Sequence, residues 1–165
     1  MKEPILESKT VQLYPFSNDD LELMMAWRSH PEVYRYFLLQ EGPLIWEDHY
    51  RFWNSRQDRY DWIINYDDGI CKRKVGSINV SKLSSEEPEV GIFIGEITLM
   101  KKGIGKEALR LIVEWLKGER YGQACAYISK DNLPSQKLFS SLGFKKSAEA
   151  HNGVEWKYVI SFGSD

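Results

Sequence analysis

Glu89 to Leu116 reads EVGIFIGEITLMKKGIGKEALRLIVEWL, and this stretch decides the fold. Its first part, Val90–Ile94, is rich in β-branched and aromatic residues and predicts a strand. A basic turn that contains two glycines follows at residues 101–106. Beyond the turn, apolar residues recur along one face and predict a helix. They are Ile104, Ala108, Leu109, Ile112, Val113 and Leu116.

The turn between this strand and this helix suits a phosphate group. Gly103 and Gly105 let backbone N–H groups approach an anion, and the helix N-terminus carries about half a positive charge. Lys101, Lys102 and Lys106 add full charges. Taken alone, the glycine pattern fits a simple tight turn equally well, and a solvated charge cluster is the alternative for the three lysines. It also lacks the Gly-x-x-x-x-Gly-Lys-Ser/Thr motif and the third glycine of a dinucleotide fingerprint.

A second stretch, Tyr127 to Phe144, reads YISKDNLPSQKLFSSLGF. Together the two stretches resemble the GNAT family of acetyl-CoA-dependent N-acetyltransferases. The first stretch matches the family's x-x-x-Gly-x-Gly pyrophosphate loop and helix. The second matches its Asn-x-x-Ser-x-x-Leu-aromatic-x-x-x-Gly-Phe segment. The spacing between the two also fits, and the likeness extends over most of the chain.

Composition predicts one ordinary globular domain over residues 1–165. Hydrophobic residues make up 42% and charged residues 28% of the chain, which is typical of a soluble protein. The net charge of −2 gives no general attraction to nucleic acid or to an anionic membrane. Cys71 and Cys125 lie far apart without histidines at metal-ligand spacing, so we expect no metal. The absence of a signal peptide and of any long apolar run predicts a cytoplasmic protein.

The predicted order of elements is β-α-α-β-β-β-α-β-α-β-β. Ser17 caps the first helix, and Asn152-Gly153 joins a closing hairpin of residues 144–148 and 154–162. The family resemblance implies an α/β (α+β) fold. Its sheet would be mixed, mostly antiparallel and splayed, with about seven strands flanked by about four helices. The cofactor would lie in the gap where the strands splay.

The resemblance also implies where acetyl-CoA, the expected cosubstrate, would bind. The main chain of Ile92, Phe93 and Ile94 would pair with the pantetheine arm like an added strand. Asn132 and Ser135 would lie near the pantetheine. The pyrophosphate would be held by the turn Met100, Lys101, Lys102, Gly103, Ile104, Gly105 and Lys106. Met100 departs from the family's usual Gln or Arg, but a backbone cradle does not need that side chain.

Acetyl transfer needs a neutral amine that attacks the thioester, a donor for the oxyanion, and departure of the thiolate. A main-chain N–H near Phe93 can serve the oxyanion. In many relatives a tyrosine protonates the sulfur, but here Phe139 stands at that position. A thiol of pKa about 8.5 is still a tolerable leaving group, because its anion lies only about 2 kcal/mol above the thiol at pH 7. Tyr127 or Ser135 could supply a hydroxyl instead.

Three residues are candidates for the general base that deprotonates the amine. Glu89, at the start of the central strand, is the first, and an edge carboxylate in water is its alternative. Glu96 is the second. His49 has a suitable ordinary pKa, but it shares a helical face with aromatic residues, so a packed, hydrogen-bonded histidine is the other interpretation.

Two segments bear on the acceptor, residues 27–31 (WRSHP) and 47–52 (EDHYRF). They resemble the acetyltransferases of the pseudaminic acid pathway, which act on the 4-amino group of a UDP-linked amino sugar. Arg28 could bind a nucleotide phosphate, and His49 could hydrogen-bond it. Four aromatic residues could stack on uracil or cover the sugar: Tyr34, Tyr36, Phe37 and Phe52. Alternatively, Arg28 only caps its helix C-terminus.

Other amine acceptors stay open at this point. A RimJ/RimL-like protein α-amino acetyltransferase shares this organisation. A polyamine acetyltransferase would need clustered carboxylates in its acceptor site. The densest acidic clusters of this chain fall in predicted turns, at residues 67–68 and 86–87. A binding module that holds acetyl-CoA without turnover is a third alternative. A homodimer through an edge strand fits the family.

Overall fold

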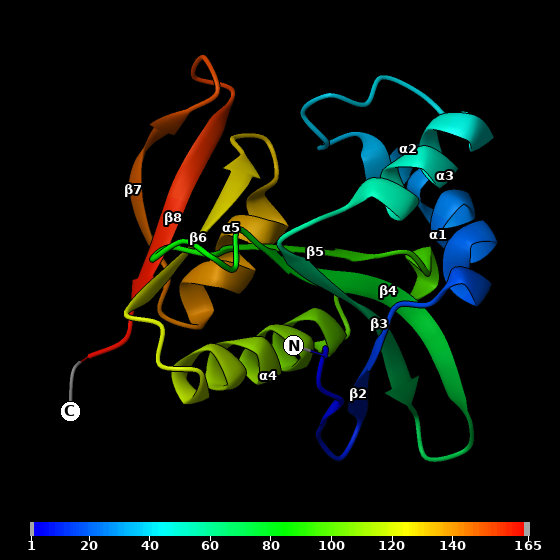
Figure 1. Ribbon diagram of the computed structural model, residues 1–165, viewed down its shortest axis with the longest axis horizontal. Coiled ribbons are helices and arrows are strands. Elements are labelled where there is room, and N and C mark those ends of the chain that lie inside the picture. The colour runs from blue at the N-terminus through cyan, green and yellow to red at the C-terminus, as the bar shows by residue number, and fades with distance from the viewer. Residues whose placement is uncertain (1, 164–165) are drawn as a thin grey trace.

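The structure is a computed structural model, and it describes residues 2–163. Its centre is an eight-stranded sheet in the order β1-β2-β3-β4-β5-β6-β8-β7 (Figure 1). Neighbouring strands are antiparallel except for β5 and β6, which are parallel. The strands are β1 (Leu6–Glu7), β2 (Val11–Pro15), β3 (Arg59–Asp67), β4 (Lys72–Ser81), β5 (Glu89–Ile94), β6 (Gln123–Ser129), β7 (Lys145–Ala150) and β8 (Glu155–Ser161).

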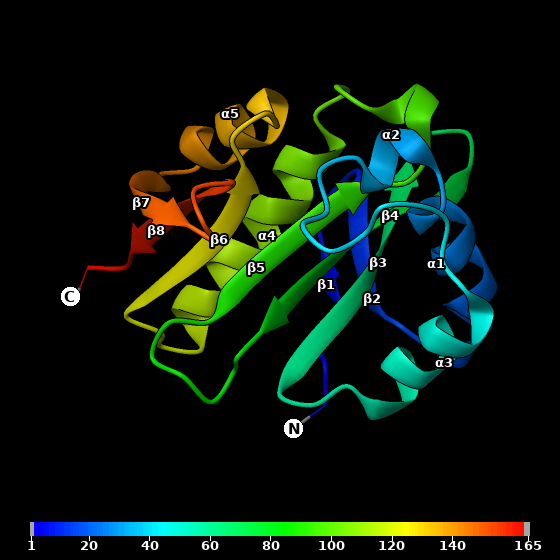
Figure 2. The same cartoon turned by 90° about the horizontal axis from the view of Figure 1, so that it is seen from above.

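Helices cover both faces of the sheet, as Figure 2 shows from above. One group is α1 (Leu21–Arg28), α2 (Pro31–Tyr34) and α3 (Trp46–Ser55). The other is α4 (Ile104–Gly118) and α5 (Leu133–Ser141). Two short 3-10 turns occur at Asn18–Asp20 and Ile97–Leu99. No helix within residues 2–163 combines the length and the apolar character that a membrane crossing requires.

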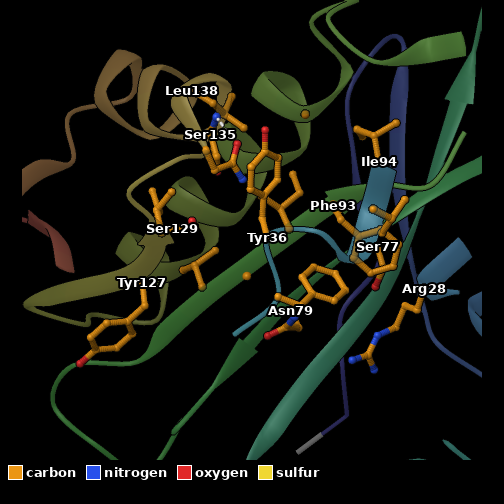
Figure 3. Close-up of a pocket in the computed structure, with 18 of the residues that line it drawn as sticks. Arg28, Tyr36, Ser77, Asn79, Phe93, Ile94, Tyr127, Ser129, Ser135 and Leu138 are labelled. Carbon is orange, nitrogen blue, oxygen red and sulfur yellow. Dashed lines mark hydrogen bonds between the residues drawn. The ribbon is translucent and has the colours of Figure 1, made fainter. Parts of the chain in front are cut away.

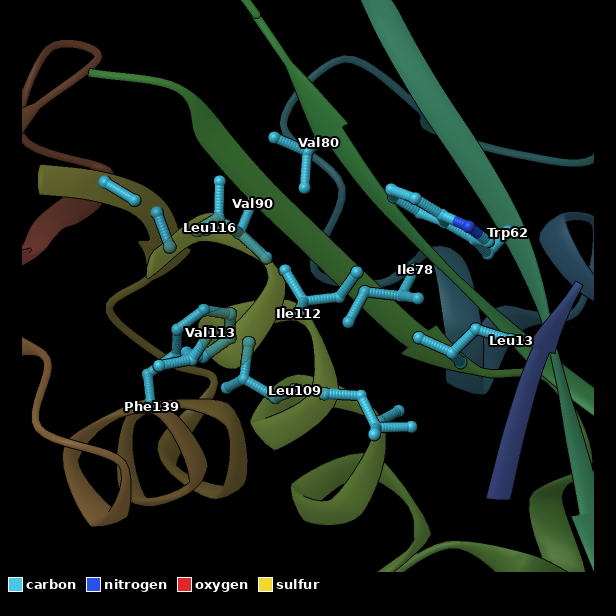
Figure 4. Close-up of a cluster of buried hydrophobic side chains, with 14 of the residues drawn as sticks. Leu13, Trp62, Ile78, Val80, Val90, Leu109, Ile112, Val113, Leu116 and Phe139 are labelled. Carbon is cyan, nitrogen blue, oxygen red and sulfur yellow. The ribbon is translucent and has the colours of Figure 1, made fainter. Parts of the chain in front are cut away.

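The main core lies between α4 and the sheet (Figure 4). Leu109, Ile112 and Leu116 are fully buried on α4, so the apolar stripe predicted from the sequence is confirmed. Full burial of each such side chain contributes about 1.5–3 kcal/mol. A second, smaller core lies on the opposite face under α1 and α3. It contains Phe16, Leu21, Met24, Trp27, Trp53 and Ile63.

The sheet splays between β5 and β6. These strands pair at one position, Glu89 with Cys125, where the Cys125 N–H donates to the Pro88 carbonyl at 2.9 Å. At the far end of β5, the Gly95 N–H donates to the Val75 carbonyl of β4 at 2.8 Å. Peptide groups alternate in direction along a strand. Odd-numbered residues of β5 therefore face β4 with their main chain, and even-numbered ones face the gap.

The predicted fold is confirmed. The structure adds one strand and one helix that were not predicted, and both are short. β1 has two residues and α2 has four, too few to give a periodic pattern. Ser17 is an N-cap as predicted, but of the 3-10 turn Asn18–Asp20 that leads into α1; its N–H donates to the Asp20 carboxylate at 2.9 Å. The closing hairpin is also present, but its turn occupies residues 151–154, with positive φ at His151, Asn152 and Gly153. Three consecutive left-handed residues make a longer loop than the Asn-Gly pair alone predicts.

Candidate active site

A cavity of about 920 Å³ fills the gap between the splayed strands (Figure 3). β4 and β5 form one wall, and the end of β6 and the start of α5 form the other. Residues of α2 and of the segment that follows it also line the space. The cavity has two ends, which we call the cofactor half (near Lys101, Gly103, Asn132 and Ser135) and the acceptor half (near Arg28, Phe52, Arg59 and Asp61).

The cofactor half contains most of the residues predicted for acetyl-CoA. Gly103 has φ +81° and Lys101 has φ +62°, so the chain turns sharply before α4 begins at Ile104. Such a turn aims backbone N–H groups at a common point. Met100, Lys101, Gly103, Gly105 and Lys106 line the cavity. Lys102 and Ile104 are not among the lining residues. Ile104 is only 3% exposed and belongs to the core.

Asn132 and Ser135 both line the cavity, at the N-terminus of α5. The Asn132 side-chain oxygen accepts a hydrogen bond from the Ser135 N–H at 3.2 Å. Asn132 therefore caps α5 and leaves its side-chain NH₂ group for a ligand.

The main chain of β5 offers an unpaired edge to the cavity. By the alternation described above, the N–H and C=O groups of Ile92 and Ile94 face the gap, whereas those of Phe93 face Ser77 on β4. An added strand would therefore pair with Ile92 and Ile94. The expected oxyanion donor near Phe93 is then the N–H of Ile92 or Ile94 rather than that of Phe93 itself, and this role stays a prediction. The Phe93 side chain instead lines the cavity, with its ring 6.3 Å from Trp27 and 5.9 Å from Phe37.

Polar side chains line the floor of the acceptor half. Asp61 is 1% exposed, and its carboxylate is paired with Arg59 at 2.6 Å and with Arg56 at 3.2 Å. A buried charge requires such pairing. The neighbouring residue on β4 is Asn79, which faces Asp61 across the strand pair. Arg59, Asp61 and Asn79 all line the cavity.

Arg28 lies at this end of the cavity as a half-buried guanidinium (Figure 3). It lies 5.4 Å from the centre of the Phe37 ring. Within residues 2–163, Arg28 forms no ion pair, because Asp61 is held by Arg56 and Arg59 instead. Burial and then the charge of Arg59 lower the pKa of Arg28, while Asp61 raises it. A guanidinium in this setting favours an anionic ligand.

Of the four aromatic residues predicted for the acceptor, Tyr36, Phe37 and Phe52 line the cavity, and Tyr34 is not among the lining residues. Arg35 lies over the Tyr36 ring at 4.6 Å, and Arg59 lies 5.3 Å from the centre of the Phe52 ring.

His49 is placed elsewhere. It is 3% exposed, and its Nε2 donates to the Leu21 carbonyl at 2.8 Å, which fixes α3 against α1. Burial lowers the pKa of His49, although the Leu21 hydrogen bond opposes this shift. It is not among the residues that line the cavity, so the structure does not bring it to the acceptor or to the reacting atoms. The packed, hydrogen-bonded histidine describes what is observed.

The structure places the two carboxylate candidates for the general base, Glu89 and Glu96, in different surroundings. Glu89 lines the cavity, and its carboxylate pairs with the Lys82 ammonium at 2.9 Å. Glu96 accepts a hydrogen bond from the Trp27 indole N–H at 2.9 Å and is not a lining residue. Phe139 lies at the cavity floor and packs edge-on against Phe144, with ring centroids 5.0 Å apart. It has no group that can donate a proton.

The residues that sequence reasoning missed are Arg59, Asp61, Ser77 and Asn79. The sequence contains a pattern that includes two of them. Ser77, Asn79 and Ser81 alternate with Ile78 and Val80 along one strand, which marks a polar face opposite the core. That pattern is common on solvent-exposed strands, so it does not by itself indicate a site.

Comparisons with known proteins identify the family and the fold. A family model described as an acetyltransferase (GNAT) domain matches residues 10–145. An uncharacterised protein of Methanocaldococcus jannaschii is 45% identical over 155 residues, covering 94% of this chain and 32% of that protein. The chain therefore spans about a third of that relative's length. An N-acetyltransferase 9-like protein of Caenorhabditis briggsae is 30% identical, covering 81% of this chain and 74% of that protein.

Solved structures show the same fold. A domain from Methanocaldococcus jannaschii matches with a TM-score of 0.90 and 44% identity, over 93% of this chain and all of that domain. A spermidine N-acetyltransferase from Vibrio cholerae, solved with CoA and spermine, matches with a TM-score of 0.78. It is 12% identical and covers 93% of this chain and 96% of that one. That likeness concerns the fold alone.

Proposed function

The chain belongs to the GNAT acetyltransferase family, and we propose that it transfers acetyl from acetyl-CoA to the 4-amino group of a UDP-linked amino-dideoxy sugar. The observation that carries the choice of acceptor is Arg28. It is a half-buried guanidinium without an ion-pair partner in the described chain, at the end of the cavity away from the cofactor turn. A diphosphate would supply the missing negative charge.

The charge of the acceptor half favours an anion over a polycation. Arg28 and Arg59 line the cavity there with Asp61, whose charge Arg56 and Arg59 offset. Glu32 and Arg35, which also line the cavity, pair with each other. Asp67, Asp68, Glu86 and Glu87, the dense carboxylates that a polyamine site could have used, are not among the lining residues. A polyamine would therefore meet a net positive charge at this end, which costs binding free energy.

Aromatic side chains give the same half a surface for a base or a sugar ring. Phe37 lies beside Arg28 and Phe52 beside Arg59. Tyr36 lines the same cavity, with its ring towards Ser135 in the view of Figure 3. A planar base stacked on such a ring gains about 1–3 kcal/mol. A nucleotide could thus be held by its diphosphate at Arg28 and by its base on an aromatic face, with the sugar amine directed towards β5.

The thioester and the acceptor amine would meet at β5, where the two halves of the cavity join. The neutral amine attacks the thioester carbon, a C–N bond forms, and the C–S bond breaks. The oxyanion is within the reach of the gap-facing N–H groups of β5, those of Ile92 or Ile94. Glu89 or a water beside it takes the proton from the nitrogen. The CoA thiolate leaves as such and is protonated by water, so Phe139 presents no obstacle.

The test is release of free CoA thiol from acetyl-CoA with three acceptors: a UDP-4-amino-4,6-dideoxy sugar, N-terminal peptides and spermidine. We expect thiol release with the sugar nucleotide. In Arg28→Ala we expect kcat/KM to fall about 100-fold, since a hydrogen bond to a charged group is worth about 1.5–3 kcal/mol. Arg51→Ala is the matched control, because the Arg51 side chain is 75% exposed on the same helical layer.

Each other outcome has a defined meaning. Release with peptides alone indicates a RimJ/RimL-like protein acetyltransferase and leaves Arg28 as a helix cap. Release with spermidine alone indicates a polyamine enzyme. Tight binding of acetyl-CoA without release from any acceptor indicates a non-catalytic module. All three contradict the proposal.

A further inference from the structure

Three residues form a row across the middle of the sheet on the cavity side. In the strand register, Asp61 on β3 lies opposite Asn79 on β4, and Asn79 lies opposite Gly91 on β5. Side chains at matched positions share one face of a sheet. Asp61, Asn79 and Gly91 all line the cavity, and Asn79 stands at the middle of its wall in Figure 3.

The side chain of Asn79 lies over Gly91. A Cβ at position 91 would be 3.0 Å from the Asn79 Nδ2 and 3.3 Å from its Oδ1. Because residue 91 is a glycine, the three atoms nearest to the built Cβ all belong to the Asn79 amide. The amide therefore lies over Gly91 on the cavity face of β5.

The Asn79 amide differs from its polar neighbours in having no internal partner. The Ser77 hydroxyl donates to the Trp62 carbonyl at 3.0 Å, and the Asp61 carboxylate is held by two arginines. In the part of the chain that the structure describes, the Asn79 amide makes no hydrogen bond. An amide in a cavity wall has one strong acceptor and two donors to offer a ligand.

The position of the amide indicates what it would hold. Gly91 directly precedes Ile92, whose N–H faces the gap where the thioester would lie. We infer that Asn79 binds the attacking nitrogen of the acceptor. Its side-chain oxygen accepts a hydrogen bond from one amine N–H, which turns the nitrogen lone pair towards the thioester carbon. This inference rests on the proposed function only in taking the cavity as the place of transfer.

An amide suits this task better than a carboxylate. The attacking amine must be neutral, and a carboxylate at this distance would stabilise its protonated form. A neutral oxygen orients the nitrogen without that effect. Asp61, one strand further away, carries a charge that Arg56 and Arg59 already offset.

Two CoA thioethers test the inference without any sugar or nucleotide. One carries S-CH₂-CO-NH-CH₃, which places an N–H where the acceptor nitrogen would be. The other carries S-CH₂-CO-O-CH₃, which lacks that N–H. In the wild-type protein the amide probe should bind about fivefold more tightly than the ester probe, the value of one net hydrogen bond. Isothermal titration gives both affinities.

Variants assign the preference to one side chain. Asn79→Ala should abolish the fivefold preference and leave the affinity for CoA within about twofold, whereas Asn79→Asp, which keeps an acceptor oxygen, should retain it. Gly91→Ala crowds the amide at 3.0 Å and should also reduce the preference. Asn65→Ala is the control, because the Asn65 amide bonds the Ile63 carbonyl outside the cavity.

Three results would overturn the inference: no preference in the wild-type protein, a preference that survives Asn79→Ala, or an equal loss of CoA itself in Asn79→Ala. The last would make Asn79 a cofactor-binding residue. Since neither probe contains the proposed acceptor, failure of the sugar-nucleotide assignment leaves this result readable, and failure here leaves that assignment untouched.

Discussion

Gly95→Ala should destabilise the protein strongly, unlike a substitution at a glycine whose Cβ would meet open space. A Cβ at this position would lie 2.2 Å from Trp27 Cγ and 2.5 Å from Cδ1, so the indole has no room. Trp27 is 4% exposed in the second core, and its N–H donates to the Glu96 carboxylate. Overpacking costs about 1–3 kcal/mol, and loss of a hydrogen bond to a charged group costs about 1.5–3 kcal/mol.

The expected loss of unfolding free energy is therefore about 3–5 kcal/mol. Urea unfolding followed by far-ultraviolet circular dichroism measures it. Gly118→Ala is the matched control, because nothing lies within 4 Å of its Cβ and it ends α4. It should stabilise the protein by up to about 1 kcal/mol. A loss below about 1 kcal/mol in Gly95→Ala would refute the reasoning.

A smaller effect in the double variant Trp27→Ala/Gly95→Ala than the sum of the single effects would confirm that the indole is the obstacle. Because Arg28 directly follows Trp27, folded Gly95→Ala protein should also lose affinity for the acceptor while it keeps acetyl-CoA binding. Equal loss of both ligands would show that Gly95 does not act through α1.

Three further predictions concern single groups. Phe139→Tyr should change kcat by less than about threefold, because a thiolate of pKa about 8.5 leaves without an acid; a tenfold rise would show that protonation limits the rate. His49→Gln should act on stability: the pKa of His49 is lowered by burial, so the unfolded chain binds a proton below about pH 6.5 that the folded chain does not. In the wild-type protein, the free energy of unfolding should therefore decrease as the pH is lowered below about 6.5. In the variant it should decrease less steeply. Burial and nearby carboxylates raise the pKa of the Cys125 thiol to about 12, so a thiol reagent at pH 8 should label exposed Cys71 and spare Cys125 in the folded protein; labelling of both would contradict that burial.

The sequence predicted the fold where patterns were long. The α4 stripe, the central strand and the basic glycine turn are local features, and each was confirmed as an element. β1 and α2 were not predicted, because elements of two and four residues are too short to show a periodic pattern of apolar residues. They form through pairing and packing that only the folded chain supplies.

The lining of one end of the cavity was predictable, because one contiguous turn supplies most of its residues; that this turn binds acetyl-CoA stays a prediction. The acceptor side is built from separate strands and helices. Nothing local in the sequence shows that Asp61, Asn79 and Gly91 form one row, since this depends on the register of three strands. Nor could helical spacing decide whether His49 faces the cavity or α1. A homodimer and a cytoplasmic location stay predictions.

The most direct test of the central claim compares a UDP-linked 4-amino sugar with the methyl glycoside of the same amino sugar, which lacks the nucleotide. The measurement is kcat/KM for thiol release with each, in the wild-type protein and in Arg28→Ala. The account predicts a preference of about 100-fold or more for the UDP-linked sugar in the wild type, which largely disappears in Arg28→Ala. Equal use of both sugars, or a preference that Arg28→Ala leaves unchanged, would contradict a nucleotide site at Arg28.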